Sequence, residues 1–235
     1  MHVWLAGLFA YGLARRMGLG RAAALFAGLC FELSGYFVSQ AQHLGAVCGA
    51  AWIPLAWHGA IELNRRPDAR RTALLAAGLA MSFPAGFTAI TILAFASTAL
   101  LALLLWMRRP SHFRPPLFIA SAAALAVALC AVQLLPTLEL SALSTAYKRG
   151  TFSEEGGGIP WQGLVSMLLP GRYGVLDSIE PKFGVNPSFL YLYAGLATLV
   201  LALAGIVWSA GWRWVLAVMT GFHLLWMMGA TRLPG

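Results

Sequence analysis

Charged residues are scarce in this chain of 235 residues: they make up 10% of it, and only eight are acidic. A soluble domain carries about 25% charged residues, so this chain lacks the polar groups that cover a soluble surface. Hydrophobic residues make up 60%, and the mean hydropathy is +0.74. These values exclude an ordinary soluble domain and predict an integral membrane protein.

Several catalytic and metal-binding motifs are also missing. The sequence has no Gly-rich phosphate loop, no His and Cys cluster with metal-ligand spacing, and no serine or cysteine triad. Cys30, Cys48 and Cys130 lie within apolar runs, so we interpret them as small core residues rather than a disulfide framework. The N-terminus lacks the basic region of a cleavable signal. No metal ligands are predicted, and dependence on a divalent metal is left open.

The net charge of +8 would suit a nucleic-acid-binding protein. In a membrane chain, however, arginine clusters between spans report orientation and attract anionic lipid. We therefore predict membrane lipid, and not nucleic acid, as a partner.

Eight apolar segments follow one another along the chain. Most approach the roughly 20 residues that a helix needs to cross a bilayer. They lie near residues 3–14, 22–38, 44–61, 73–82, 85–106, 117–135, 190–209 and 214–229. The predicted fold is all-α: a polytopic transmembrane helix bundle with about 7–8 membrane segments. The predicted regions are 1–135 with short loops, an external loop at 136–189, and two further transmembrane helices at 190–235.

The basic residues orient these segments. Eleven of the 16 fall in connections on one side: Arg15, Arg16, Arg21, Arg65, Arg66, Arg70, Arg71, Arg108, Arg109, Arg114 and Arg213. By the positive-inside rule that side is cytoplasmic. The predicted location is a bacterial plasma membrane, crossed several times.

This orientation requires residues 73–106 to form a short-armed hairpin, because both flanks of that run are basic. As one helix its 34 residues would span about 51 Å, against a hydrocarbon core of about 30 Å. Pro84 and Gly86 supply a break. The alternative is one long, kinked and tilted helix.

The external loop at 136–189 holds five of the eight acidic residues and is long enough to be functional. Within it Trp161, Leu164, Val165, Leu168 and Leu169 recur at helical spacing. This pattern predicts a short amphipathic helix along the membrane surface, which either roofs a site or only packs.

Glu32 is the most unusual residue, because it lies inside a predicted span where an ionisable group is costly. Its 3–4 spacing with Gly28, Gly35 and Ser39 predicts one narrow, polar helix face. Glu32 is interpreted either as lining a substrate cavity or holding a cation, or as making a structural hydrogen bond to a neighbouring span.

Three other residues can contact a phosphate or sugar at the outer side. His43, beside Gln40 and Gln42, is either a ligand to such a group or an interfacial residue. Arg149 and Arg172 are external arginines suited to bidentate contact with a lipid phosphate, or to ordinary headgroup anchoring.

Four stretches carry a family resemblance. They are Leu33–Phe37 through His43 to Ala51–Leu55, the break at Ser82–Pro84, Gln133–Ser141, and Leu168–Gly174 followed by Tyr191–Gly195. Together they resemble the YfhO-type bacterial membrane proteins, which are similar to GT-C glycosyltransferases that use polyprenyl-phosphate sugars. The hairpin apex in these proteins often carries a polar or basic residue, whereas this chain reads Phe83-Pro84-Ala85 there.

The resemblance implies transfer of a sugar from a polyprenyl-phosphate donor to a cell-envelope acceptor on the outer face. It implies Arg149 and Arg172 as phosphate ligands, and Glu32, His43 and Glu139 as cavity-lining residues. GT-C enzymes keep the catalytic acid in a first large external loop that this chain does not contain, so no catalytic residue is assigned. The predicted orientation starts Met1 outside, the sequence stops just after a span, and family members are longer, so we expect a fragment or a gene truncated at both ends.

Two alternatives remain open. One is a carrier for a lipid-linked sugar or small solute, with Glu32 and the broken hairpin as its midplane site. The other is a non-catalytic subunit or remnant. Whether a partner subunit completes the site is also open.

Overall fold

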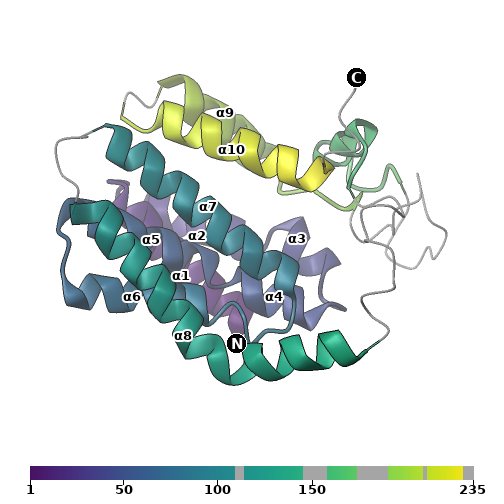
Figure 1. The fold of residues 1–235 in the computed structure, drawn as a ribbon. Helices are drawn as coiled ribbons and strands as arrows, with labels where there is room; N and C mark the ends of the chain where they lie inside the picture. Colours follow the sequence, from purple (N-terminus) through teal and green to yellow (C-terminus); the bar gives the residue numbers. More distant parts are fainter. Residues whose placement is uncertain (109–113, 145–157, 174–189, 209–210, 230–235) are drawn as a thin grey trace. The chain divides into compact units, whose positions relative to one another are not determined.

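The computed structural model describes residues 1–108, 114–144, 158–173, 190–208 and 211–229 (Figure 1). In these ranges the chain is helical and contains no strand, which confirms the predicted all-α class. The elements are α1 (His2–Arg16), α2 (Arg21–Glu32), α3 (Gly35–Ser39), α4 (Leu44–Ala50), α5 (Ile53–Arg65), α6 (Ala69–Ala80), α7 (Thr88–Met107), α8 (Arg114–Leu143), the 3-10 helix η2 (Trp161–Met167), α9 (Leu196–Trp208) and α10 (Arg213–Met228).

Four stretches within the described residues are long and apolar enough to cross a membrane. They are Arg21–Ser39, Leu44–Arg65, Thr88–Met107 and Arg114–Leu143. Two shorter apolar helices, α9 and α10, follow them. Length and composition thus support a membrane protein, while the count of seven to eight segments stays a prediction.

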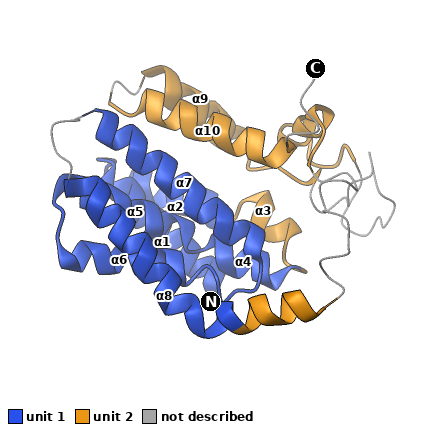
Figure 2. Cartoon of the chain, viewed as in Figure 1, with its two compact units in different colours: residues 1–32, 43–135 blue, residues 33–42, 136–235 orange. Residues whose placement is uncertain are grey.

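The chain forms two compact units (Figure 2). Unit 1 contains Met1–Glu32 and His43–Leu135; unit 2 contains Leu33–Gln42 and the described residues from Pro136 onward. The short helix α3 belongs to unit 2 because the Gly35 amide donates a hydrogen bond to the Tyr193 carbonyl at 2.8 Å. The division into regions 1–135, 136–189 and 190–235 stays a prediction.

Helices α5 and α6 pack closely through small residues. A Cβ atom on Gly59 would lie 2.8 Å from Leu75 Cα, and one on Gly78 would lie 2.8 Å from the Ala56 nitrogen. Pairing 59 with 75 and 56 with 78 makes the two helices antiparallel. Small residues at such an interface let helix backbones approach, as is common between membrane helices.

The predicted break near Pro84 separates α6 from α7. Gly86 has a φ of +81° in the turn, a conformation that glycine adopts without strain. Thr91 donates its hydroxyl to the Ser82 carbonyl at 3.1 Å, which ties the turn to the start of α7. Trp57 of α5 donates to Ser97 of α7 at 3.2 Å.

The direction of α7 follows from its neighbours. A Cβ on Gly45 would meet Ala85 and Phe87, and one on Gly49 would meet Ser82 and Ile90. Together with the Trp57–Ser97 hydrogen bond, these contacts show that α7 lies parallel to α4 and α5. Helix α7 is therefore antiparallel to α6. Residues 69–107 form two antiparallel helices rather than one long kinked helix.

Helix α8 continues to Leu143, whereas the sequence places the start of the external loop at residue 136. Pro136 lies inside this helix, where it removes one backbone donor but does not end the helical run. The earlier part of α8 packs its small residues into the core of unit 1. Ala122, Ala126 and Cys130 are buried there, and Cys130 Sγ lies 3.3 Å from the Ala80 carbonyl oxygen.

The helical face predicted for Gly28, Glu32, Gly35 and Ser39 is not continuous. Helix α2 ends at Glu32, and Ser34 has extended backbone angles before α3 begins. Gly28 packs against the Gly7 carbonyl in unit 1. Gly35 packs against Tyr193 in unit 2, and the four residues belong to two helices rather than one.

In unit 2 the predicted amphipathic segment forms the 3-10 helix η2. Ser166 is buried on its inner side and donates to the Gly163 carbonyl at 2.7 Å. The predicted apolar side is largely exposed, with Trp161 and Leu168 near 58% and 57%. The exposed apolar side suits an interfacial location, which stays a prediction.

We expect Gly59→Ala to destabilise unit 1 by about 1–3 kcal/mol, because the added methyl group forces the α5 and α6 backbones apart. Unfolding midpoints in detergent would measure the loss. The control is Gly205→Ala in α9, where a Cβ would meet no atom within 4 Å and the change should be neutral or stabilising. Equal effects of the two changes would contradict the close-packing argument.

Candidate functional site

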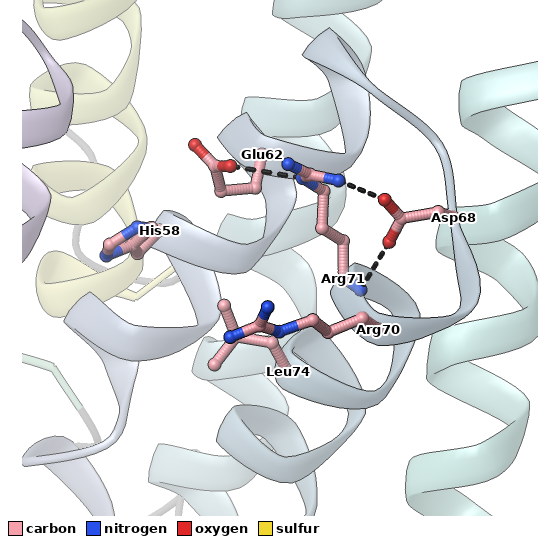
Figure 3. A pocket seen from close by; sticks show the side chains of 6 residues that line it. All are labelled: His58, Glu62, Asp68, Arg70, Arg71 and Leu74. Carbon is pink, nitrogen blue, oxygen red and sulfur yellow. Dashed lines mark hydrogen bonds and ion pairs between the residues drawn. The ribbon is translucent and has the colours of Figure 1, made fainter.

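A cavity of about 640 Å³ lies where α5 ends and α6 begins (Figure 3). Its lining residues are His58, Glu62, Asp68, Arg70, Arg71 and Leu74. The volume falls in the usual range for ligand sites. All six residues belong to unit 1, and four of them carry a formal charge.

Local chain geometry places the acidic side chains. Asp68 is extended and caps α6 by accepting a 2.9 Å hydrogen bond from the Arg71 amide. An aspartate at this position satisfies one of the free N–H groups of the first helical turn. The Asp68 carboxylate also pairs with the Arg71 guanidinium.

Glu62 is the centre of the ion pairs. Its side chain is only 13% exposed and pairs with Arg16 of α1 and with Arg71 of α6, whose Nε lies 3.1 Å from Glu62 Oε2. One carboxylate therefore connects three helices. These contacts span 46 positions between Arg16 and Glu62, so they depend on the packing of α1 against α5.

Positive charge is concentrated around this carboxylate. Arg65 donates to the Arg16 carbonyl at 3.2 Å. Burial lowers the pKa of Arg16, and the neighbouring charges of Arg65, Arg71 and Arg66 lower it further. Arginines outnumber carboxylates in this region, so its field attracts an anion.

Glu62 and Asp68 are functional candidates that the sequence reasoning did not single out. From the sequence, residues 62–68 are interpreted as a polar connection between two spans, and their arginines are used only to predict the membrane orientation. A signal was present, because Glu62 is an acidic residue directly after the apolar segment 44–61, with Arg65 and Arg66 following it. Its partners cannot be identified without the packing of α1.

A second cavity, of about 360 Å³, lies elsewhere in unit 1. It is lined by His2, Leu44, Gly45, Cys48, Trp52, Met81, Pro84 and Ala85. These residues come from the first turn of α1, from α4 and the residues after it, and from the turn between α6 and α7. Trp52 packs on His2 and Phe9, with ring centroids 6.3 Å and 5.3 Å apart.

The predicted site residues of unit 1 lie outside both cavities' linings. Glu32 is half-buried at the end of α2, and its carboxylate lies against Gly7 of α1, so a Cβ on Gly7 would overlap it. His43 is half-buried and immediately precedes α4. Their proposed roles stay predictions.

The other predicted site residues belong to the second half of the chain. Glu139 is exposed on the last turns of α8, and Arg172 is exposed in the turn after η2. Arg149 lies outside the described residues. No described contact joins Glu139 to Arg172, and their roles also stay predictions.

Within the described ranges, no group of three or more His, Cys, Asp or Glu side chains is placed to hold a metal ion. Dependence on a metal stays open.

Comparison with protein families, with curated proteins and with solved structures finds no match.

We expect Arg16 and Glu62 to be energetically coupled. A double-mutant cycle with Arg16→Gln and Glu62→Gln should give a coupling of about 1 kcal/mol or more, because Glu62 is largely buried. Unfolding midpoints of the four proteins would measure it. Arg15 is the matched control, since it binds the Leu19 carbonyl instead; a similar coupling of Arg15 to Glu62 would contradict a specific pair.

The cap at Asp68 should make stability depend on pH. The Arg71 amide and guanidinium lower the pKa of Asp68 below its ordinary value of 3.8. The ionised cap therefore stabilises the fold above about pH 4, and this contribution is lost as pH falls through the lowered pKa.

The variant Asp68→Asn keeps a capping oxygen but does not titrate. We expect wild type to be the more stable protein at pH 6 and the difference to shrink toward zero below pH 3. Unfolding midpoints between pH 2 and pH 7 test this. A difference that is constant over that range would contradict the assignment.

Proposed function

We propose that this chain is part of an integral membrane glycosyltransferase. It transfers a sugar from a polyprenyl-phosphate donor to a cell-envelope acceptor at the outer face of a bacterial plasma membrane. The observation that carries the proposal is the cavity lined by Trp52 and the α6–α7 turn, because its position agrees with the predicted orientation.

The positive-inside rule predicts that the start of α1, the start of α4 and the α6–α7 turn lie on the outer side. The second cavity is built from these three segments. The cavity at the other end of α5 is lined by Arg70 and Arg71, which the same rule places on the cytoplasmic side. The two cavities thus support one consistent orientation of unit 1.

The lining of the outer cavity suits a sugar. Trp52 offers a flat apolar ring and an N–H donor, and a sugar ring presents C–H faces and hydroxyl groups to such a surface. His2 adds a side chain that both donates and accepts hydrogen bonds. Pro84 and Ala85 leave space because their side chains are small.

The transfer forms a bond between the acceptor oxygen and the anomeric carbon while the bond from that carbon to the phosphate oxygen breaks. The polyprenyl phosphate leaves with the electron pair, and the acceptor proton passes to a base. We propose Arg149 and Arg172 as the ligands of the departing phosphate. Glu32, His43 and Glu139 would line the substrate path, and the base is not assigned.

One observation favours a carrier instead. The helix break between α6 and α7, together with Glu32 packed on Gly7, resembles the interrupted helices and polar groups of transporter sites. A carrier would move a lipid-linked sugar or a small solute without forming a glycosidic bond.

Membrane vesicles that contain the full chain would separate the two functions, using a labelled sugar on polyprenyl phosphate. For a transferase, Arg172→Ala should reduce incorporation of label into the acceptor at least tenfold, since it removes a charged phosphate ligand. The labelled donor should still reach the outer face. Arg213→Ala, an exposed arginine predicted on the cytoplasmic side, is the control.

If Arg172→Ala blocks arrival of the donor at the outer face, the transferase proposal fails and the carrier is favoured. If wild type gives neither incorporation nor translocation, a non-catalytic subunit is favoured.

A further inference from the structure

We propose that the cavity between α5 and α6 binds the phosphodiester headgroup of one anionic phospholipid, with Arg70 as its principal ligand. This site lies at the opposite end of α5 from the sugar cavity and does not depend on the proposed transfer.

The first support is the charge balance around the cavity. Two carboxylates, Glu62 and Asp68, face an excess of guanidinium groups. The arginines in or next to the site are Arg16, Arg65, Arg66, Arg70 and Arg71. With both carboxylates ionised, the cluster keeps a surplus of positive charge, and a phosphodiester would reduce the repulsion among its guanidinium groups.

The second support is the state of the individual arginines. Glu62 and Asp68 hold the guanidinium of Arg71, and Glu62 also holds Arg16. Among the described residues, the guanidinium of Arg70 makes no ion pair or side-chain hydrogen bond. In Figure 3 it extends beside Leu74, and no dashed line joins it to the Glu62–Arg71–Asp68 contacts. Its planar group therefore remains available for bidentate contact with phosphate oxygens.

The third support distinguishes a lipid from a free anion. The cavity lies at the end of the apolar stretch Leu44–Arg65, the level at which lipid headgroups meet a membrane protein. Leu74, one turn after Arg70, adds an apolar contact beside the phosphate ligand. A free phosphate has no apolar surface to pack on Leu74, whereas the glycerol and upper acyl chain of a lipid would pack against it.

Native mass spectrometry of the full chain in detergent, titrated with phosphatidylglycerol, would test the site. We expect one lipid to bind more tightly than the rest. Arg70→Gln should weaken that binding about tenfold, the effect of losing one charge-assisted contact. Its unfolding midpoint should be unchanged, because the side chain has no partner among the described residues.

Arg21→Gln is the matched control, since Arg21 is exposed at the start of α2 on the same predicted side but does not line the cavity. It should leave the tight site within about twofold of wild type. Equal weakening by the two substitutions would overturn the proposal in favour of a diffuse electrostatic field. Phosphatidylglycerol binding without a distinct first site would overturn it as well.

Two further titrations identify the source of the phosphate. Phosphatidylcholine, which has a phosphodiester but no net charge, should bind at least tenfold more weakly than phosphatidylglycerol. Inorganic phosphate at millimolar concentration should not displace the tight lipid. Displacement that depends on Arg70 would overturn the lipid assignment and identify a site for a free anion.

Discussion

The close approach of α5 and α6 at Gly59 and Gly78 is the constraint on which unit 1 depends. Lipid tails are as apolar as leucine side chains, so the hydrophobic effect does not by itself hold membrane helices together. Close packing of small residues supplies the contact instead, and it brings the Gly59 region within van der Waals distance of the Leu75 backbone. Because the two helices are antiparallel and adjacent, the end of one meets the start of the other, and Glu62 comes into contact with Arg71.

Glu62 extends this arrangement to a third helix. An exposed ion pair between arginine and glutamate contributes little to stability. Glu62, however, is largely buried and has two guanidinium partners. Removing it would leave Arg16 without its carboxylate partner, which is costly at this level of burial, while Arg71 would keep only Asp68. The ion pairs therefore hold α1 beside α5 and α6. Of the two arginines that line the cavity, they engage Arg71 and not Arg70.

The two cavities of unit 1 have different chemistry at opposite ends of α5. One is lined by an aromatic ring, a histidine and small side chains, and the other by charged groups. In the predicted orientation this difference places the charged cavity on the cytoplasmic side. It also separates the two proposals: the sugar chemistry concerns the aromatic cavity, and lipid recognition concerns the charged one, so each is open to test without the other.

The sequence by itself determined the helical class, the apolar stretches and the break near Pro84, because apolarity, helical period and the missing proline donor are properties of neighbouring residues. It predicted an apolar segment that ends near residue 135, and α8 continues to Leu143 because Pro136 removes one backbone donor without ending the helix. It also assigned Gly28, Glu32, Gly35 and Ser39 to one face, although the backbone is extended at Ser34. Only the tertiary structure identified the Glu62 ion pairs and the two cavities, because Arg16 and Glu62 lie 46 positions apart and one cavity joins His2 to Ala85. Their proximity is decided by helix packing, which no local pattern records.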